Sequence, residues 1–344
     1  MADTIANTVV GYQPVSGVMS AFTMTLLAVA LVVAAVVFFN LYSLAGKKRG
    51  GTTAIRLSTG DRMFYISVDL FLVFIFFIVA VPMWSTITLS FRPEGFGGTT
   101  LDGMFLAPWE WSLGAYRALL GNDGFLRAFM NSFYILTLGV ATALFLTVPM
   151  AYALSVKTLP GRRFLIVLVL IPYLFQVGLI PIFLVVRDVG LLNTRAAVFL
   201  PAAISVYNLL IMRRFFEGIP DELKESARID GANEIRVLLR IILPLSKPII
   251  MTIGLFYGVS FWNDFFSAML YIHLEALQPL PILLRNILMG AAVADVVEIG
   301  AWGSVPPEAI RAASVFLAAV PMVLAYPFIQ KYFTKGTLLG SVKG

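Results

Sequence analysis

The chain has 344 residues, of which 59% are hydrophobic and only 13% are charged, and its formal net charge is +6. The charged share is about half of the roughly 25% that is usual in soluble domains, which favours an integral membrane protein. The sequence contains no cysteine and only one histidine, His273. Disulfides, thiolate metal sites and histidine-rich metal centres are therefore excluded, and a histidine-based catalytic triad is disfavoured.

Seven apolar segments are candidates for membrane-crossing helices, since a span needs roughly 20 apolar residues. In chain order they are Val18–Tyr42, Phe64–Ile87, Asn131–Ser155, Phe164–Val186, Ala196–Met212, Pro248–Ile272 and Ala312–Gln330. No segment shows the alternation of a strand, and helices satisfy their own backbone within lipid. We therefore expect an all-α, polytopic membrane helix bundle. The first segment lacks a preceding basic region, so we expect a retained helix rather than a signal peptide.

The distribution of Lys and Arg predicts the orientation of these spans. With the N-terminus outside, the cytoplasmic segments carry 18 of these residues and the external segments carry 7. The opposite orientation would place the basic excess outside, against the positive-inside rule. The sequence therefore predicts an external N-terminus and a cytoplasmic C-terminus. The basic residues then face anionic lipid, and the net charge requires no nucleic-acid partner.

The chain divides into a short N-terminal part and one membrane domain. Residues 43–62 are basic and rich in Gly and Thr, which is typical of a flexible linker. Residues 1–62 therefore form a tail, an additional transmembrane helix and the linker, and residues 63–344 form the transmembrane domain. In the external loop after Ile87, Trp109 and Trp111 are expected to anchor the chain at the membrane interface.

A polar stretch at residues 217–247 lies between two spans, on the predicted cytoplasmic side. Pro220 is expected at the first position of a short helix, where its missing N–H costs nothing. Within that helix Glu225 and Arg228 can pair at i, i+3. Gly231 allows the positive φ that ends a helix.

A second amphipathic helix follows this glycine. Its apolar residues recur at helical spacing from Ile235 to Ile242, and Pro244 is expected to stop it. The two helices form an elbow that can dock a cytoplasmic partner. The alternative is an ordinary loop whose charged residues are solvated.

The elbow resembles the conserved loop of permeases from ATP-binding-cassette (ABC) importers, written EAA---G---------I-LP. The matching residues are Glu225-Ser226-Ala227, then Gly231, then Ile241-Ile242-Leu243-Pro244. Ser226 departs from the usual alanine, but it is also small. Stretches such as "SVYNLLIMRRFFEGIPDELKESARIDGA" extend the resemblance from about Asp61 to Gly344. They are similar to carbohydrate importer permeases of the MalG type, and within these to the LplC-like branch.

This resemblance implies the fold, the partners and the location of the protein. It implies a six-helix importer permease core of the MetI-like type, to which the span Val18–Tyr42 is an addition. The chain would lie in the bacterial cytoplasmic (inner) membrane as part of a binding-protein-dependent system. The implied partners are a second permease subunit, a dimer of ABC ATPase subunits and an extracytoplasmic solute-binding protein.

The resemblance also implies how the chain couples to ATP. The first elbow helix would insert into the cytoplasmic ATPase, which assigns the coupling role to Glu225, Ala227, Asp230 and Gly231. The sequence has no G-x-x-x-x-G-K-[ST] phosphate loop. We therefore expect the chain to be no enzyme and to bind no cofactor, with ATP and Mg²⁺ used by the partner ATPase.

Polar residues in or beside the spans are candidates for the substrate path. They are Gln176, Asn208, Asn263 and Asp264. Polar groups within spans are costly and mark transport paths, although Asn and Gln also join helices by hydrogen bonds. Pro172 and Pro181 flank Gln176, so that span is expected to be kinked or broken.

The expected substrate is a carbohydrate, namely an oligo- or polysaccharide, and glycerol phosphate or another non-sugar is the alternative within importers. Two other functional classes are weaker. A stand-alone secondary transporter or channel would need more buried acids than the spans contain. A membrane-embedded enzyme would need clustered acids, histidines or metal ligands.

Overall fold

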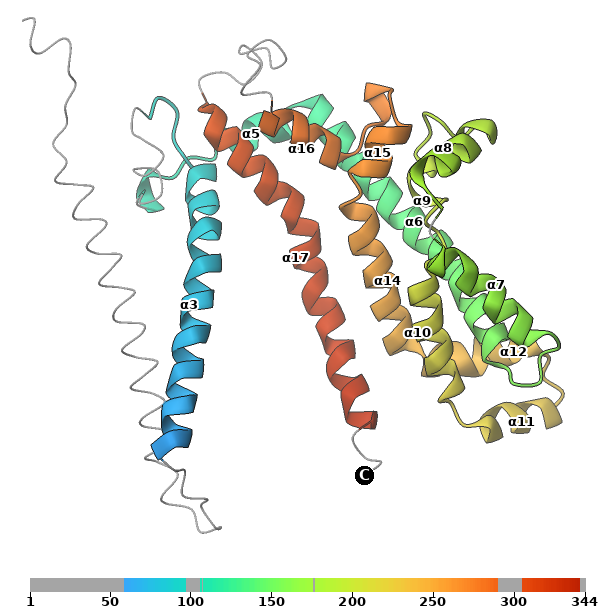
Figure 1. Ribbon diagram of the computed structural model, residues 1–344. Helices are drawn as coiled ribbons and strands as arrows, with labels where there is room; N and C mark the ends of the chain where they lie inside the picture. The colour runs from blue at the N-terminus through green and yellow to red at the C-terminus, as the bar shows by residue number, and fades with distance from the viewer. Residues whose placement is uncertain (1–58, 97–105, 107, 176, 290–304, 341–344) are drawn as a thin grey trace, which may run out of the picture. The chain divides into compact units, whose positions relative to one another are not determined.

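The computed structural model describes residues 59–96, 106, 108–175, 177–289 and 305–340 (Figure 1). The predicted first span Val18–Tyr42 lies outside the described residues. The described helices are α3 (Thr59–Ser90), η2 (Pro108–Glu110), α5 (Gly114–Leu120), α6 (Asp123–Ser155), α7 (Arg162–Leu174), α8 (Leu179–Asp188), α9 (Ala196–Phe199), α10 (Val206–Glu217), α11 (Asp221–Ile229), α12 (Glu234–Val237), η3 (Leu238–Ile242), α13 (Leu243–Leu245), α14 (Lys247–Trp262), α15 (Phe266–Tyr271), η4 (Glu275–Leu277), α16 (Leu280–Met289) and α17 (Pro307–Gly340). No strand occurs in these ranges, which confirms the all-α class.

The described residues form two compact units. The first unit contains α3, the segment that follows it up to Ala115, and the start of α17 up to Ala313. In this unit the buried guanidinium of Arg92 forms an ion pair with Glu308 at 2.5 Å. Trp109 is 85% exposed, whereas Trp111 stacks on Phe91 and its indole N–H donates to a backbone carbonyl. Trp111 therefore packs within the protein. Of the two predicted interfacial anchors, Trp109 is the one that is exposed enough to contact the membrane interface.

The second unit is built around α6, which packs against α10 and α14 (Figure 1). Its core contains aliphatic and aromatic side chains from all three helices, including Ile135, Leu209 and Ile253. The elbow helices α11 and α12 lie at one end of this unit, and α8, α15 and α16 lie at the other. The elbow is thus well separated from the loops that precede α16.

Three of the six predicted spans in the described part of the chain are continuous helices. They are Phe64–Ile87 within α3, Asn131–Ser155 within α6 and Ala312–Gln330 within α17. These three helices are long and apolar enough to cross a membrane, and the described residues contain up to five such spans if each bent helix pair is one. The polytopic membrane bundle predicted from composition is confirmed.

The other three predicted spans are interrupted. Phe164–Val186 divides into α7 and α8, which confirms the break expected between Pro172 and Pro181. Ala196–Met212 was expected as one helix and this is wrong, because α9 ends before Pro201 and Ser205 caps a new helix, α10. Pro248–Ile272 is also interrupted, since α14 ends at Trp262 and α15 begins at Phe266. Pro172 and Pro181 flank the first of these breaks, and the Ser205 side chain caps the helix that follows the second.

Candidate functional site

The first helix of the elbow is α11, and local sequence sets both of its ends. Pro220 occupies the capping position, so the helix begins one residue later than predicted. Asp221 and Glu222 occupy its first turn. Acidic side chains there are favoured by the helix dipole. Gly231 has a φ of 77°, the left-handed conformation that ends a helix at low cost. The predicted glycine bend is confirmed.

The second helix of the elbow is longer than predicted. Asn233 caps it by accepting a hydrogen bond from the N–H of Arg236 at 2.9 Å. The helix runs through α12, a π-helical turn (η3) and α13 to Leu245, and the stop expected at Pro244 is wrong. Pro244 follows the π turn at the start of α13, where its missing N–H is tolerated. The chain instead bends by 83° between Leu245 and Lys247.

The four predicted coupling residues lie on or beside α11, and three of them are exposed. Glu225, Asp230 and Gly231 face outward, whereas Ala227 is half-buried and packs against the core. The apolar side chain of Ile229 is 87% exposed on the same short segment. An exposed aliphatic residue among acidic groups is a surface suited to a protein partner.

Arg228 pairs with a different acid from the one the sequence suggested. The expected i, i+3 pair with Glu225 is wrong, because Arg228 Nε donates to Glu234 Oε1 at 2.8 Å. The same carboxylate accepts a hydrogen bond from the Tyr152 hydroxyl at 2.6 Å, from the last turn of α6. The turn at Gly231 brings α12 back toward α11, so a residue outside the first helix becomes the nearer partner.

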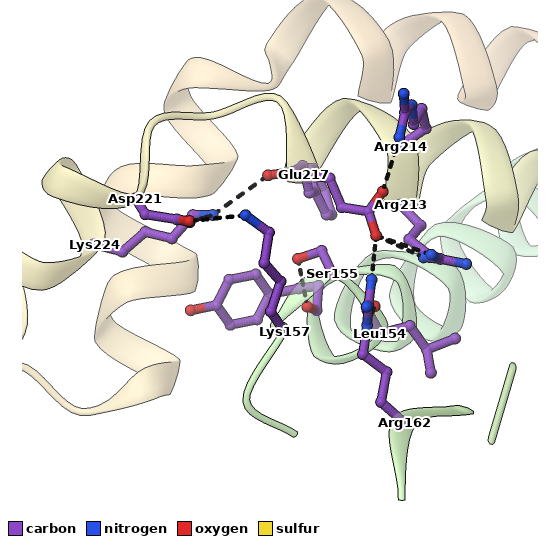
Figure 2. A network of polar contacts seen from close by, with 11 residues as sticks. Leu154, Ser155, Lys157, Arg162, Arg213, Arg214, Glu217, Asp221 and Lys224 are labelled. Carbon is purple, nitrogen blue, oxygen red and sulfur yellow. Dashed lines mark hydrogen bonds and ion pairs between the residues drawn. The ribbon is translucent and has the colours of Figure 1, made fainter. Parts of the chain in front are cut away.

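A second charged cluster joins the end of α10 to the start of α7 (Figure 2). The carboxylate of Glu217 lies among Arg162, Arg213 and Arg214, and forms an ion pair with each of them. The Nη2 atom of Arg213 is 2.9 Å from Glu217 Oε1. Burial alone would raise the pKa of Glu217, but the hydrogen bond and charge of Arg213 and the charges of the other two arginines outweigh it and lower that pKa.

Two lysines meet Asp221 at the start of α11, as Figure 2 shows. Lys224 is only 4% exposed, and its ammonium donates to Asp221 Oδ1 at 3.0 Å and to the Phe216 carbonyl at 3.5 Å. Lys157, from the loop after α6, donates to the other oxygen of Asp221 at 3.3 Å. The hydrogen bonds from Lys224 and then Lys157 lower the pKa of Asp221.

Sequence reasoning missed these two clusters and the Tyr152 contact. Part of the Glu217 cluster could have been predicted from the sequence. Arg213 and Arg214 lie four and three residues before Glu217, which is the spacing of ion pairs on a helix. Nothing local identifies Tyr152 or Arg162 as partners, because they are 82 and 55 residues away from the acids that they contact.

The structure does not bring the candidate substrate-path residues together. Asn208 is buried on α10 and lines a cavity of about 510 Å³. Asn263 lines a different cavity of about 460 Å³, and its amide nitrogen donates to the Val259 carbonyl. Asp264 lies two residues before α15, and its carboxylate accepts a hydrogen bond from the Ser267 N–H at 3.0 Å. Gln176 lies outside the described residues.

The cavity beside Asn208 has a mixed lining. The residues that line it are Ala202, Ile204, Ser205, Tyr207, Asn208, Phe256, Tyr257 and Ser260. Hydroxyl and amide groups there stand next to aromatic rings, and none of these residues is charged. Such a surface can hydrogen-bond the hydroxyl groups of a sugar and stack against its apolar face.

Comparisons with known proteins agree on one family. Residues 112–338 match the family described as binding-protein-dependent transport system inner membrane component. The chain is 41% identical to the polygalacturonan/rhamnogalacturonan transport system permease protein YtcP of Bacillus subtilis, over 83% of this chain and 99% of that protein. It is 42% identical to protein LplC of Bacillus subtilis, over 82% and 96%.

A solved structure gives the same result. A chain in the crystal structure of a bacterial ABC transporter involved in the import of the acidic polysaccharide alginate superposes with a TM-score of 0.74. The two chains are 30% identical, and the match covers 81% of this chain and 100% of the other.

Proposed function

This chain belongs to the family of binding-protein-dependent transport system inner membrane components, and we propose that it forms one half of the translocation pathway of a carbohydrate importer. A second permease subunit supplies the other half, and an extracytoplasmic binding protein delivers the substrate. The N-terminus lies outside and the C-terminus lies in the cytoplasm. The excess of Lys and Arg in the segments that this orientation places in the cytoplasm supports it.

The exposed face of α11 carries the coupling proposal. Glu225, Asp230 and Ile229 offer an acidic and apolar surface to a cytoplasmic ATPase dimer, which binds ATP and Mg²⁺. Closure of the ATPase moves α11, and the bundle changes between inward-open and outward-open states. The sequence of this chain has no phosphate loop, so hydrolysis belongs to the partner.

The substrate is an oligosaccharide or polysaccharide. The names of two similar proteins, a polygalacturonan/rhamnogalacturonan permease and an alginate importer, support this class. The uncharged cavity beside Asn208 supports it chemically, because its amide, hydroxyl and aromatic groups suit a sugar ring. Asn208 is therefore the candidate for substrate contact that the structure favours over Asn263 and Asp264.

The test uses the complete transporter reconstituted in proteoliposomes. Glu225→Lys reverses a charge on the docking surface, so we expect sugar uptake to fall at least tenfold while the chain stays in the membrane. Glu110→Lys makes the same charge change at an exposed site in η2 and should retain uptake. Normal uptake by Glu225→Lys would refute the coupling role.

Two further measurements separate this function from the alternatives. ATPase activity should rise when the binding protein carries oligomers of galacturonate or alginate, and a panel with neutral oligosaccharides and glycerol phosphate defines the class. Uptake by this chain alone, driven by an ion gradient and without ATPase subunits, would instead indicate a secondary transporter.

A further inference from the structure

We propose that α6 is the helix that receives the movement of α11, and that Tyr152 and Glu234 are the positioning residues that join the two. This inference rests on the proposed docking of α11 to an ATPase. It concerns a different question, namely which membrane-spanning helix the elbow is fastened to. The contacts at both ends of α11 lead to the same place, the end of α6 and the loop that follows it.

The first attachment is at the C-terminal end of α11. One carboxylate, that of Glu234, accepts hydrogen bonds from the Tyr152 hydroxyl at 2.6 Å and from Arg228 Nε at 2.8 Å. These residues belong to α6, α11 and α12, so a single carboxylate joins three elements. Tyr152 is buried, and hydrogen bonds to a charged acceptor are about twice as strong as neutral ones. Packing therefore fixes the Tyr152 end of the link, whereas the Arg228–Glu234 pair is 37% and 55% exposed and contributes less.

The second attachment is at the N-terminal end of α11. Asp221 pairs with Lys157, which follows α6 by two residues. At the end of α10, Glu217 pairs with Arg162, and the Nε of this arginine donates to the Leu154 carbonyl at 2.8 Å. The carbonyl belongs to the last turn of α6. The corner between α10 and α11 is thus tied to α6 independently of Tyr152.

The position of α6 makes it suited to carry the movement across the unit. It has 33 residues, which corresponds to roughly 50 Å at 1.5 Å per residue. It packs along α14 and α10, and near its other end Asn131 donates to the carbonyls of Ala276 and Gln278. A displacement of its cytoplasmic end is therefore transmitted to the segment before α16.

The first experiment measures the ratio of sugar transported to ATP hydrolysed in the complete transporter. Tyr152→Phe removes only the hydroxyl and retains the ring, so the bundle keeps its packing. We expect this ratio to fall about tenfold, the factor that corresponds to the loss of one charge-assisted hydrogen bond, because α11 can then move without α6. The matched control is Tyr271→Phe, another buried tyrosine, which stacks on Phe183 and should keep the wild-type ratio.

Two double variants test whether the attachments are arranged as proposed. Tyr152→Phe and Glu234→Gln each remove one partner of the same hydrogen bond. The double variant should therefore lower the ratio of transport to hydrolysis no further than the more damaging single variant. Tyr152→Phe with Glu217→Gln weakens both attachments, because Glu217→Gln removes the ion pair with Arg162, so the two losses should multiply. Multiplying losses in the first pair, or a wild-type ratio in Tyr152→Phe, would overturn the proposal.

A distance measurement gives a readout that stability alone does not change. Because this chain has no cysteine, Ala153→Cys on α6 and Glu222→Cys on α11 place two spin labels at exposed sites with no other label on this chain. Their distance should be the same in the nucleotide-free and ATP-bound transporter, and should broaden or shift between these states when Tyr152→Phe is added. A wild-type distance that changes between the two states would show that α11 moves independently of α6.

The outcome for Glu225→Lys separates the two proposals. If Glu225→Lys abolishes uptake while Tyr152→Phe keeps the wild-type ratio and distance, the docking function stands and the link to α6 is wrong. If neither variant affects uptake, the docking function itself is wrong.

Discussion

The helices α3 and α6 are both apolar and long enough to cross a membrane, but their polar side chains behave differently. In the most apolar part of α3 no residue is buried, whereas 28% of the corresponding part of α6 is buried. The hydroxyls of Ser67, Ser85 and Thr86 in α3 bond back to carbonyls of their own helix. In α6, by contrast, side chains such as Asn131 and Thr147 bond to other elements.

Hydropathy therefore identifies a helix that can cross the membrane. The hydrogen-bond partners of its polar side chains show whether other elements of the core are held against that helix. A hydroxyl that bonds to the preceding turn satisfies itself in lipid and adds little to tertiary stability. A polar group that bonds to a distant element fixes the position of that element. Two sets of variants replace polar groups in α6 and α3, and a third compares glycines of α6 and α14. In each case we measure the free energy of unfolding in detergent micelles by denaturant titration.

The largest effect is expected at Asn131. Its amide donates to the carbonyls of Ala276 and Gln278, each at 3.0 Å, and its oxygen accepts from Arg195 Nε at 2.9 Å. Asn131→Leu leaves these three partners without their hydrogen bonds, so we expect a loss of about 3 kcal/mol. Ser67→Ala in α3 should change stability by less than ~0.5 kcal/mol. Equal effects of the two variants would remove the distinction between the helices.

A smaller effect is expected where α6 meets α14. A Cβ at Gly139 would lie 2.8 Å from a ring carbon of Phe261, so Gly139→Ala should force the helices apart and cost about 2 kcal/mol. The matched control is Gly254→Ala on α14, where the nearest atom, from Leu144, is at an ordinary 3.5 Å. We expect this control to be neutral or stabilising, because alanine is the better helix former. Destabilisation by both would indicate a tighter interface than the structure describes.

The smallest effect is expected from a matched pair of threonines. Thr147 and the Tyr257 hydroxyl are 2.8 Å apart and buried, so Thr147→Val should cost about 1 kcal/mol. Thr86→Val in α3 removes a hydroxyl that bonds only to the Pro82 carbonyl of the same helix, at 2.9 Å, and should cost less than half as much. A larger loss in Thr86→Val would reverse the comparison.

Much of the elbow could be predicted from sequence because its causes are local. The acidic first turn of α11, the positive φ of Gly231 and the helical spacing after it depend on residues close in the chain. The ends were less predictable, as the misplaced stop at Pro244 shows. A π turn that makes a proline acceptable has no clear sequence signal.

The candidate substrate path could be predicted only as a set of residue types. Polarity within a span identified both Asn208 and Asp264, but only the structure distinguishes an amide beside a cavity from a carboxylate that binds a backbone N–H of α15. The assignment of coupling to Glu225 and its neighbours stays a prediction, which the proposed variants test.

The sequence by itself determined that this chain is a helical membrane protein, where its elbow lies and to which family it belongs. Composition, helical spacing and a motif within about 20 residues carry these conclusions, because each depends on near neighbours. Only the tertiary structure decided that Arg228 binds Glu234 rather than Glu225, that the Tyr152 hydroxyl donates to the same Glu234, and that Arg162 pairs with Glu217. Those contacts arise from how the helices pack, which brings together groups that the chain keeps many residues apart.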